Sequence, residues 1–121
     1  MPDLDGYGLS LTTEEAGPVL IVHVAGDLDM LTGPHLDEYV RDKIAARTPQ
    51  HLVLDLGRVT FLGSSALSVL IGLARNDLDV RLHLTAVSGN RAVQQTLDLV
   101  GMTPLFDIHD DVADLLRHLP G

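Results

Sequence analysis

An almost continuous apolar run near the middle of the chain places the strongest limit on its fold. Within the segment His51 to Leu56, the residues Leu52, Val53, Leu54 and Leu56 are apolar. A strand with one solvated face alternates apolar and polar residues, whereas a strand covered on both faces is apolar nearly throughout. The run therefore predicts a central strand that is covered from both sides.

The residues before this strand have the patterns of a hairpin and a helix. Alternation predicts strands over Gly8 to Thr13 and Val19 to Ala25, joined by a turn over Glu14 to Pro18. The loop GDLDMLTGP follows, and Thr32 within it is placed to cap an amphipathic helix. An antiparallel hairpin followed by a helix is the expected start of the fold.

The residues after the central strand alternate between helix and strand patterns. The expected helices cover Ser64 to Ala74, Ala92 to Val100 and Val112 to Leu119, and the expected strands cover Val80 to Ala86 and Leu105 to Ile108. In the first of these strands, His83 and Thr85 fall on the more solvated face. Strands that alternate with helices pair in parallel through right-handed crossovers, so the predicted fold class is α/β. We expect a mixed β-sheet opened by an antiparallel hairpin and covered by about four helices.

Charge and length exclude several classes of function. The 121 residues are close to the usual size of one domain, so we expect a single domain over residues 1–121. Seventeen Asp and Glu against eight Lys and Arg give a formal charge of −9, which disfavours contact with nucleic acid or an anionic membrane. No apolar run approaches the length of a bilayer span, so we expect a cytoplasmic protein.

The sequence carries no motif for a metal or a cofactor. Cysteine is absent, and the six histidines lack paired metal-ligand spacing such as HExxH. The glycines form neither a dinucleotide-binding fingerprint nor a phosphate-binding loop. We therefore expect no metal site and no cofactor.

Two adjacent serines, Ser64 and Ser65, stand where the chain enters a helix after the central strand and a short loop, Gly57 to Gly63. Unpaired N–H groups and the positive end of the helix dipole make such a position favourable for an anion. On the pattern alone, a plain helix cap is favoured over a regulatory role.

The string GSSAL also resembles the G-x-S-x-G elbow that exposes the nucleophile of serine hydrolases. Leu67, however, occupies the position of the final glycine. Asp107, His109 and His118 could complete a triad on paper, but the chain is short for a hydrolase with a substrate pocket. A small serine hydrolase is therefore the least favoured of three interpretations, and the other two are given below.

Three stretches resemble the STAS-domain family, and within it the single-domain anti-sigma factor antagonists. They are GDLDMLTGPHL at Gly26 to Leu36, DLGRVTFLGSSALSVLIG at Asp55 to Gly72, and the closing LTAVSGNRAVQQTLDLVGMTPLFDIHDDVADLL. The central stretch is the more specific, because it follows the family pattern D-L-S-x-V-x-F-x-D-S-S-G-L-x-x-L in register. The matching residues are Asp55, Leu56, Val59, Phe61, Ser64, Ser65 and Leu67.

The resemblance implies a regulatory protein that is a kinase substrate and not itself an enzyme. Such antagonists compete with a sigma factor for an anti-sigma factor that is also a serine kinase, and phosphorylation of the antagonist ends the binding. The phosphorylated residue implied here is Ser64, with Ser65 as the alternative. The residues implied to face the kinase are Asp27, Asp29, Met30, Leu31, Thr32, Gly63, Ser64, Ser65 and Ser68.

Two positions depart from the family pattern. Gly63 stands in place of Asp, and Ala66 stands in place of Gly, where we expect its methyl group beside the hydroxyls. The missing carboxylate leaves a second interpretation open, a STAS subunit of a transport or stress-signalling assembly that docks without phosphorylation. Asp27 and Asp29 likewise have the alternative role of turn caps.

Overall fold

The computed structural model describes residues 3–4, 8–75, 80–87, 89–99, 101 and 107–118. Its elements are β1 Asp3–Leu4, β2 Ser10–Ala16, β3 Val19–Leu28, α1 Gly33–Arg47, β4 His51–Leu62, α2 Ser64–Ala74, β5 Arg81–Thr85, α3 Arg91–Leu99, β6 Asp107–His109 and α4 Val112–His118. The strands form one six-stranded sheet in chain order. β1, β2 and β3 pair antiparallel, and β3 to β6 pair in parallel. The predicted α/β fold with an opening hairpin is confirmed.

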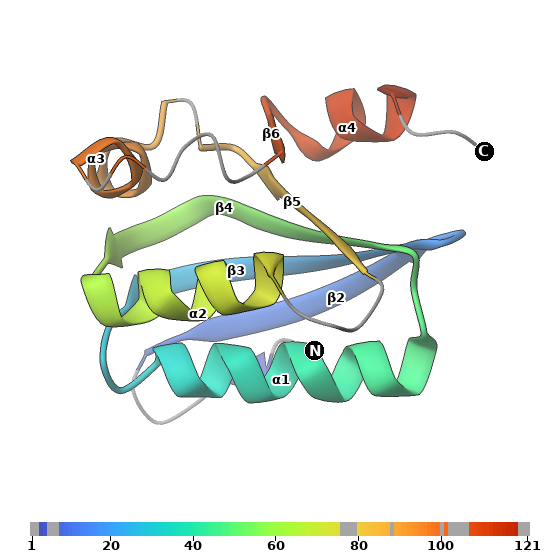
Figure 1. Cartoon of the computed structure of the whole chain (residues 1–121), viewed down its shortest axis with the longest axis horizontal. Coiled ribbons are helices and arrows are strands. Elements are labelled where there is room, and N and C mark those ends of the chain that lie inside the picture. The colour runs from blue at the N-terminus through green and yellow to red at the C-terminus, as the bar shows by residue number, and fades with distance from the viewer. Residues whose placement is uncertain are drawn as a thin grey trace.

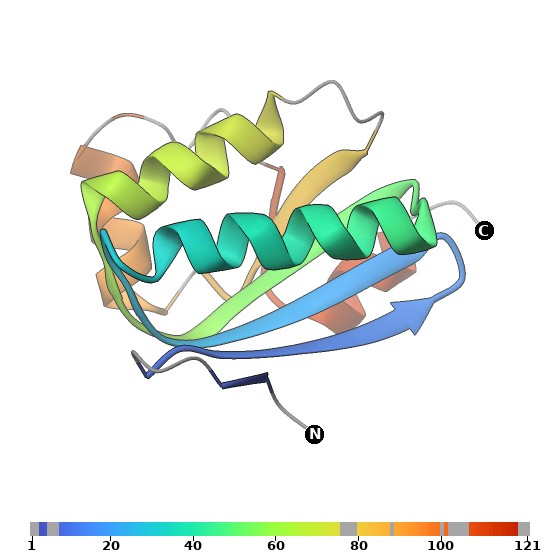
Figure 2. The same ribbon diagram turned by 90° about the horizontal axis from the view of Figure 1, so that it is seen from below.

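Helices cover both faces of this sheet (Figures 1 and 2). α1 and α2 lie side by side on one face, over the larger core. A smaller core under α4, on the other face, consists of Val19, Ile21, Val53 and Leu115. Leu52 and Leu54 belong to the larger core and Val53 to the smaller one, which explains why the central run is apolar almost throughout.

Strands β2, β3 and β4 run further than the sequence pattern predicts, and β3 continues from Ala25 through Leu28. β2 continues through Ala16, so the hairpin turn shortens to Gly17 and Pro18. β4 continues from Leu56 through Leu62 along β3, and the predicted loop over Gly57 to Gly63 is wrong. Two register shifts in β3 accompany this extension, and irregular pairing of this kind breaks the alternation that marks a strand in sequence.

The prediction of a solvated face on β5 is also wrong. His83 and Thr85 are 3% and 0% exposed. The His83 ring lies between the rings of His51 on β4 and His109 on β6, with centroids 5.2 and 5.5 Å apart. The predicted strand start at Leu105 and the predicted helix ends at Val100 and Leu119 lie outside the described residues.

α3 is fixed to the end of β4 by side chains that bond to backbone carbonyls. Pairing of β4 with β5 ends at Asp55, so the later carbonyls of β4 need other partners. The Asn90 side chain donates to the carbonyls of Leu56 and Val59 over 2.7 and 3.0 Å, and the Thr96 hydroxyl donates to Leu62 over 2.9 Å. These bonds fix the strand segment that leads into α2.

Among the helices in the described ranges, none has both the length and the apolar character that crossing a bilayer requires. The longest, α1, has 15 residues and buries only one side, through Gly33, Leu36, Val40 and Ile44.

Candidate functional site

The ends of β3 and β4 bring the two predicted halves of the site together. The strands are parallel neighbours, so the chain leaves both at the same edge of the sheet. The Gly63 N–H donates to the Leu28 carbonyl over 2.8 Å, and the Thr60 hydroxyl donates to the Asp27 carboxylate over 2.5 Å. Figure 2 shows the entries into α1 and α2 at the same end of the molecule. Two segments about thirty residues apart therefore form one surface.

The turn from β3 into α1 is held by Asp29 and Thr32. The Asp29 carboxylate accepts hydrogen bonds from the N–H groups of Leu31 and Thr32 over 2.9 and 3.0 Å. The N–H donors of Thr32 and then Leu31 hold the pKa of Asp29 below its usual value, so this carboxylate is charged at neutral pH. Asp29 thus has the turn-capping role that the sequence left as an alternative.

Thr32 shapes the same turn in a way that differs from the prediction. Its hydroxyl accepts from the Asp29 N–H over 2.8 Å and donates to the Asp27 carbonyl over 2.7 Å. Thr32 is the N-cap residue of α1, as predicted, but its side chain makes no capping hydrogen bond, because the hydroxyl is used inside the turn instead. The Thr32 side chain is completely buried, so its part in this surface is to shape the loop.

Ser64 is the first helical residue of α2 and not its cap. Gly63 occupies the cap position, with an extended backbone at φ −86° and ψ 166°, and its carbonyl accepts from the Leu67 N–H over 3.0 Å. The interpretation of Ser64 as a plain cap is therefore wrong. Ser64 and Ser65 are exposed, and within the described ranges neither hydroxyl has a hydrogen-bond partner.

One turn later, Ser68 is also exposed, and its hydroxyl donates to the Ser64 carbonyl over 3.3 Å. The opposite side of α2 is buried through Ala66, Leu67, Leu70 and Leu73. The methyl group of Ala66 faces α1, where a Cβ built on Gly33 would lie 3.6 Å from it. The expectation that this methyl lies beside the hydroxyls is wrong, because the substitution falls in the contact between the helices.

Apolar side chains lie exposed around the two turns. Met30 is 73% exposed, Leu31 57% and Phe61 51%. Sequence reasoning named Met30 and Leu31 but missed Phe61. Alternation gave no signal for this exposure, because the sequence predicted a loop over Gly57 to Gly63, and Thr60 and Phe61 are both exposed although they are neighbours in β4.

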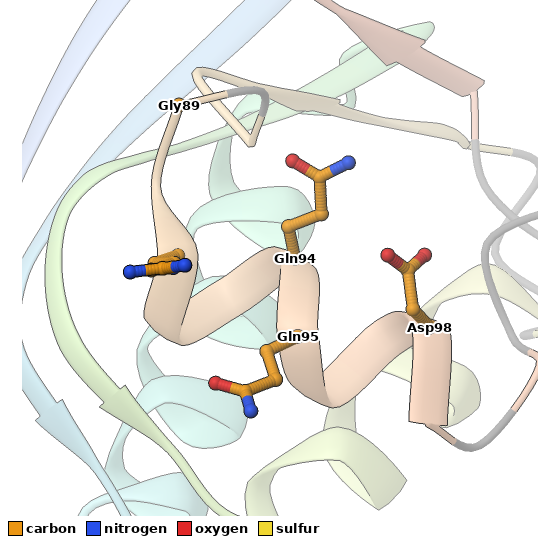
Figure 3. Close-up of a pocket in the computed structure, with 5 residues that line it drawn as sticks. Gly89, Gln94, Gln95 and Asp98 are labelled. Carbon is orange, nitrogen blue, oxygen red and sulfur yellow. The ribbon is translucent and has the colours of Figure 1, made fainter.

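Two hollows of the described surface are lined by residues other than Ser64 and Ser65. One, of about 690 Å³, is lined by Gly89, Arg91, Gln94, Gln95 and Asp98 around α3 (Figure 3). Another, of about 650 Å³, is lined by Ser10, Thr12, His23, Val24, Ala25, Asp55, Gly57 and Arg58. Neither includes Ser64 or Ser65, so a pocket for a hydrolase substrate gains no support.

The candidate triad residues have other partners. Asp107 accepts a hydrogen bond from the Arg81 guanidinium over 2.7 Å, which lowers the pKa of the Asp107 carboxyl. His109 lies 4.0 Å from Asp114. Among the contacts of the described residues, neither reaches Ser64, and the His118 side chain lies outside that description.

His23 on β3 and Asp55 on β4 line the hollow of about 650 Å³, and they form a titratable cluster with Glu14 on β2. His23 bonds to Asp55 over 2.7 Å through one ring nitrogen and to Glu14 through the other. Partial burial alone would lower the pKa of His23, but the bonds to Asp55 and Glu14 outweigh it and raise that pKa. Asp55, which matches the family pattern, therefore joins β4 to β3 on the face away from α1 and α2.

Comparison with known protein families gives a match to the STAS domain over residues 10–115. The chain belongs to the STAS-domain family. The resemblance read from the sequence is therefore confirmed. The match spans β2 to the middle of α4, and includes both turns of the candidate site.

Three relatives of this STAS domain are described as anti-sigma factor antagonists. An anti-sigma F factor antagonist of Paenibacillus polymyxa is 28% identical over 111 residues, covering 92% of this chain and 95% of its own. The anti-sigma-F factor antagonist RsfA of Mycobacterium tuberculosis is 30% identical over 113 residues, covering 89% and 85%. The crystal structure of an anti-sigma factor antagonist from Mycobacterium paratuberculosis superimposes with a TM-score of 0.79 at 26% identity, covering 93% and 95%.

Proposed function

We propose that this STAS domain is an anti-sigma factor antagonist that binds an anti-sigma factor serine kinase and thereby frees a sigma factor. Phosphorylation of Ser64, with Ser65 as the alternative, ends the binding. The domain acts in the cytoplasm as the substrate of the kinase and not as an enzyme. The contact surface, named here the switch surface, comprises Asp27, Asp29, Met30, Leu31, Thr32, Gly63, Ser64, Ser65 and Ser68.

The observation that carries this proposal is the setting of the Ser64 hydroxyl. It lies exposed at the start of α2, without a hydrogen-bond partner in the described ranges, beside a turn that Asp29 and Thr32 hold rigid. A kinase needs access to the hydroxyl it modifies, and a switch needs that hydroxyl within the contact surface. The exposure of Ser64 meets the first requirement, and its place beside the Asp29 turn supports the second.

A phosphate on Ser64 would act differently on the free domain and on the complex. It adds about −1.5 to −2 charge at pH 7. The start of α2 favours such a charge by ~0.3 to 1 kcal/mol, so the free domain tolerates it. In an interface packed around a small neutral hydroxyl, the charge must be desolvated or repelled, at a cost of several kcal/mol. Each ~1.4 kcal/mol changes affinity tenfold, so one phosphate is enough to end the binding.

Mass spectrometry after incubation with ATP and purified candidate anti-sigma kinases tests the proposal. We expect phosphate on Ser64 in the unmodified sequence and its loss in Ser64→Ala. Ser65→Ala tests the alternative site, and Ser68→Ala, which removes an exposed serine one turn along the same helix, shows whether the phosphate is specific to the helix start. Phosphate on residues outside the switch surface, with Ser64 and Ser65 unmodified, would contradict the proposal.

A further inference from the structure

Most of the large apolar side chains that are exposed lie on one edge of the sheet. Within the described ranges these are Met30, Leu31 and Phe61, with Leu116 on α4 as the remaining member at 37%. The first two follow β3, and the third is the penultimate residue of β4, where Asp27 pairs with Phe61 in the ladder. A group of exposed apolar side chains beside a rigid turn marks a candidate protein contact.

The Phe61 ring is seated on the backbone that leads into α2. A Cβ built on Gly63 would lie 3.1 and 3.5 Å from two ring carbons of Phe61. The backbone of Gly63, at φ −86°, is one that any residue adopts. Glycine at position 63 therefore provides space and not a special backbone conformation, because a side chain there would take the room that the Phe61 ring occupies.

We propose that Phe61, seated across Gly63, is the anchor of the switch surface. Its ring inserts into an apolar pocket of the anti-sigma kinase, and basic side chains surround that pocket. This inference rests on the proposed function and adds to it a residue and the chemistry of the partner. Aromatic side chains are enriched in the buried centres of protein interfaces, because they supply large contact area with few rotatable bonds.

Charge decides among the possible occupants. The carboxylates of Asp27 and Asp29 border the apolar side chains, and the chain carries a formal charge of −9. A second copy of the domain or an anionic membrane would be repelled, whereas a partner with basic groups around an apolar pocket is attracted. Charged residues at the rim and apolar residues at the centre are the usual arrangement of a protein interface.

The same geometry explains why Ser64 is sensitive to charge. Phe61 touches Gly63, and Ser64 is the next residue. When a partner covers the ring, water is removed from its surroundings, so a phosphate one residue further along would lose solvation as the ring becomes buried. The anchor and the modified hydroxyl are thus parts of one contact.

Calorimetric titration against the kinase that phosphorylates the domain tests the inference. We expect Phe61→Ala to weaken binding by about 30-fold or more, as for a residue at the centre of an interface. Leu116→Ala is the matched control, since it removes an exposed apolar side chain from another part of the surface. It should change the dissociation constant by less than about twofold.

A second pair of variants displaces the ring without removing it. Gly63→Ala places a methyl group against Phe61, and we expect it to weaken binding several-fold while the free energy of unfolding changes little, because the ring is exposed and free to swing. Gly72→Ala adds the same methyl group to α2 with nothing within 4 Å, and should bind as the unmodified domain does.

Each outcome has a distinct meaning. If Phe61→Ala binds the kinase as tightly as the unmodified domain, the anchor is overturned and the proposed function stands. If the unmodified domain binds no anti-sigma kinase, both proposals fail. Sedimentation measurements complete the test: an unmodified domain that dimerises and a Phe61→Ala domain that stays monomeric would identify a second copy as the occupant and overturn the inference.

Discussion

The Gly63 N–H donates a hydrogen bond to the Leu28 carbonyl over 2.8 Å, and this bond joins the cap of α2 to the end of β3. Leu28 ends β3 and Gly63 follows β4, so the bond belongs to the last pair of the ladder, Leu28 with Leu62. The turn at Asp29 and the hydroxyl of Ser64 are held at fixed positions as a result. A partner can therefore recognise two distant segments as one rigid surface.

Ser64→Asp should lose affinity for the kinase while keeping the fold. The carboxylate adds one negative charge near the N-terminus of α2, where the helix dipole favours it by ~0.3 to 1 kcal/mol. We expect an unchanged or slightly higher midpoint in urea and a dissociation constant raised at least about tenfold. Gln95→Asp, at an exposed position on α3 outside the switch surface, is the control. Undiminished binding by Ser64→Asp would contradict the charge argument.

Gly33→Ala should destabilise the domain. The added Cβ would lie 3.3 Å from the Cα of Ala66, and neither helix backbone can move away without disturbing the core. We expect a loss of about 1 to 3 kcal/mol in urea unfolding. Gly72→Ala is the counterpart in α2, where no neighbour lies within 4 Å, and should gain about 0.5 to 1 kcal/mol. Equal behaviour of the two variants would show that the helices pack less closely than described.

Asn90 variants separate two roles of one side chain. Its carbonyl oxygen accepts from the Val93 N–H over 3.4 Å, and its amide nitrogen donates to two carbonyls of β4. Asn90→Asp keeps a good helix cap but sets a carboxylate against those carbonyls, so we expect a loss of about 2 kcal/mol or more, at least as large as for Asn90→Ala. A stable Asn90→Asp domain would mean that capping alone matters.

The buried His83 should make the domain sensitive to mild acid. Burial is the largest cause that lowers the pKa of His83, to about 4 from an ordinary 6.5, although Asp107 opposes it. Below pH 6.5 the unfolded chain therefore takes up a proton that the folded domain refuses, and stability falls until about pH 4. The groups facing the ring are His51, His109, Asp107 and Arg81.

Urea unfolding at pH 7.5 and pH 5 measures this loss. We expect His83→Gln to lose about 1 to 2 kcal/mol less than the unmodified domain between the two values. Parallel curves for the two proteins would contradict the lowered pKa of His83.

The sequence predicts those features that depend on local patterns. Leu52 and Val53 belong to cores on opposite faces, and the continuous apolar run indicated this without knowledge of the fold. The end of β4 could not be found in the same way. Gly57 and Arg58 have the composition of a loop, and only pairing with β3 and the side chains of α3 make this segment a strand.

The same distinction between local patterns and distant contacts applies to the candidate site. A resemblance located Ser64 because the motif is contiguous in sequence. It did not reveal that Gly63 takes the cap position, or that the Thr32 hydroxyl bonds backward to Asp27. It also missed Phe61, because exposure at the end of a strand depends on where the neighbouring elements stop. Contacts between distant segments decide each of these points.

The exposed first turn of α2 has a consequence for how such a switch is phosphorylated and dephosphorylated. On the proposed function, the kinase that adds the phosphate and the phosphatase that removes it must both grasp the residues around Ser64. The kinase and the phosphatase then bind the same residues and exclude one another. The switch needs no conformational change in the sheet, so it depends on the residues around Ser64 and not on the identity of the core residues.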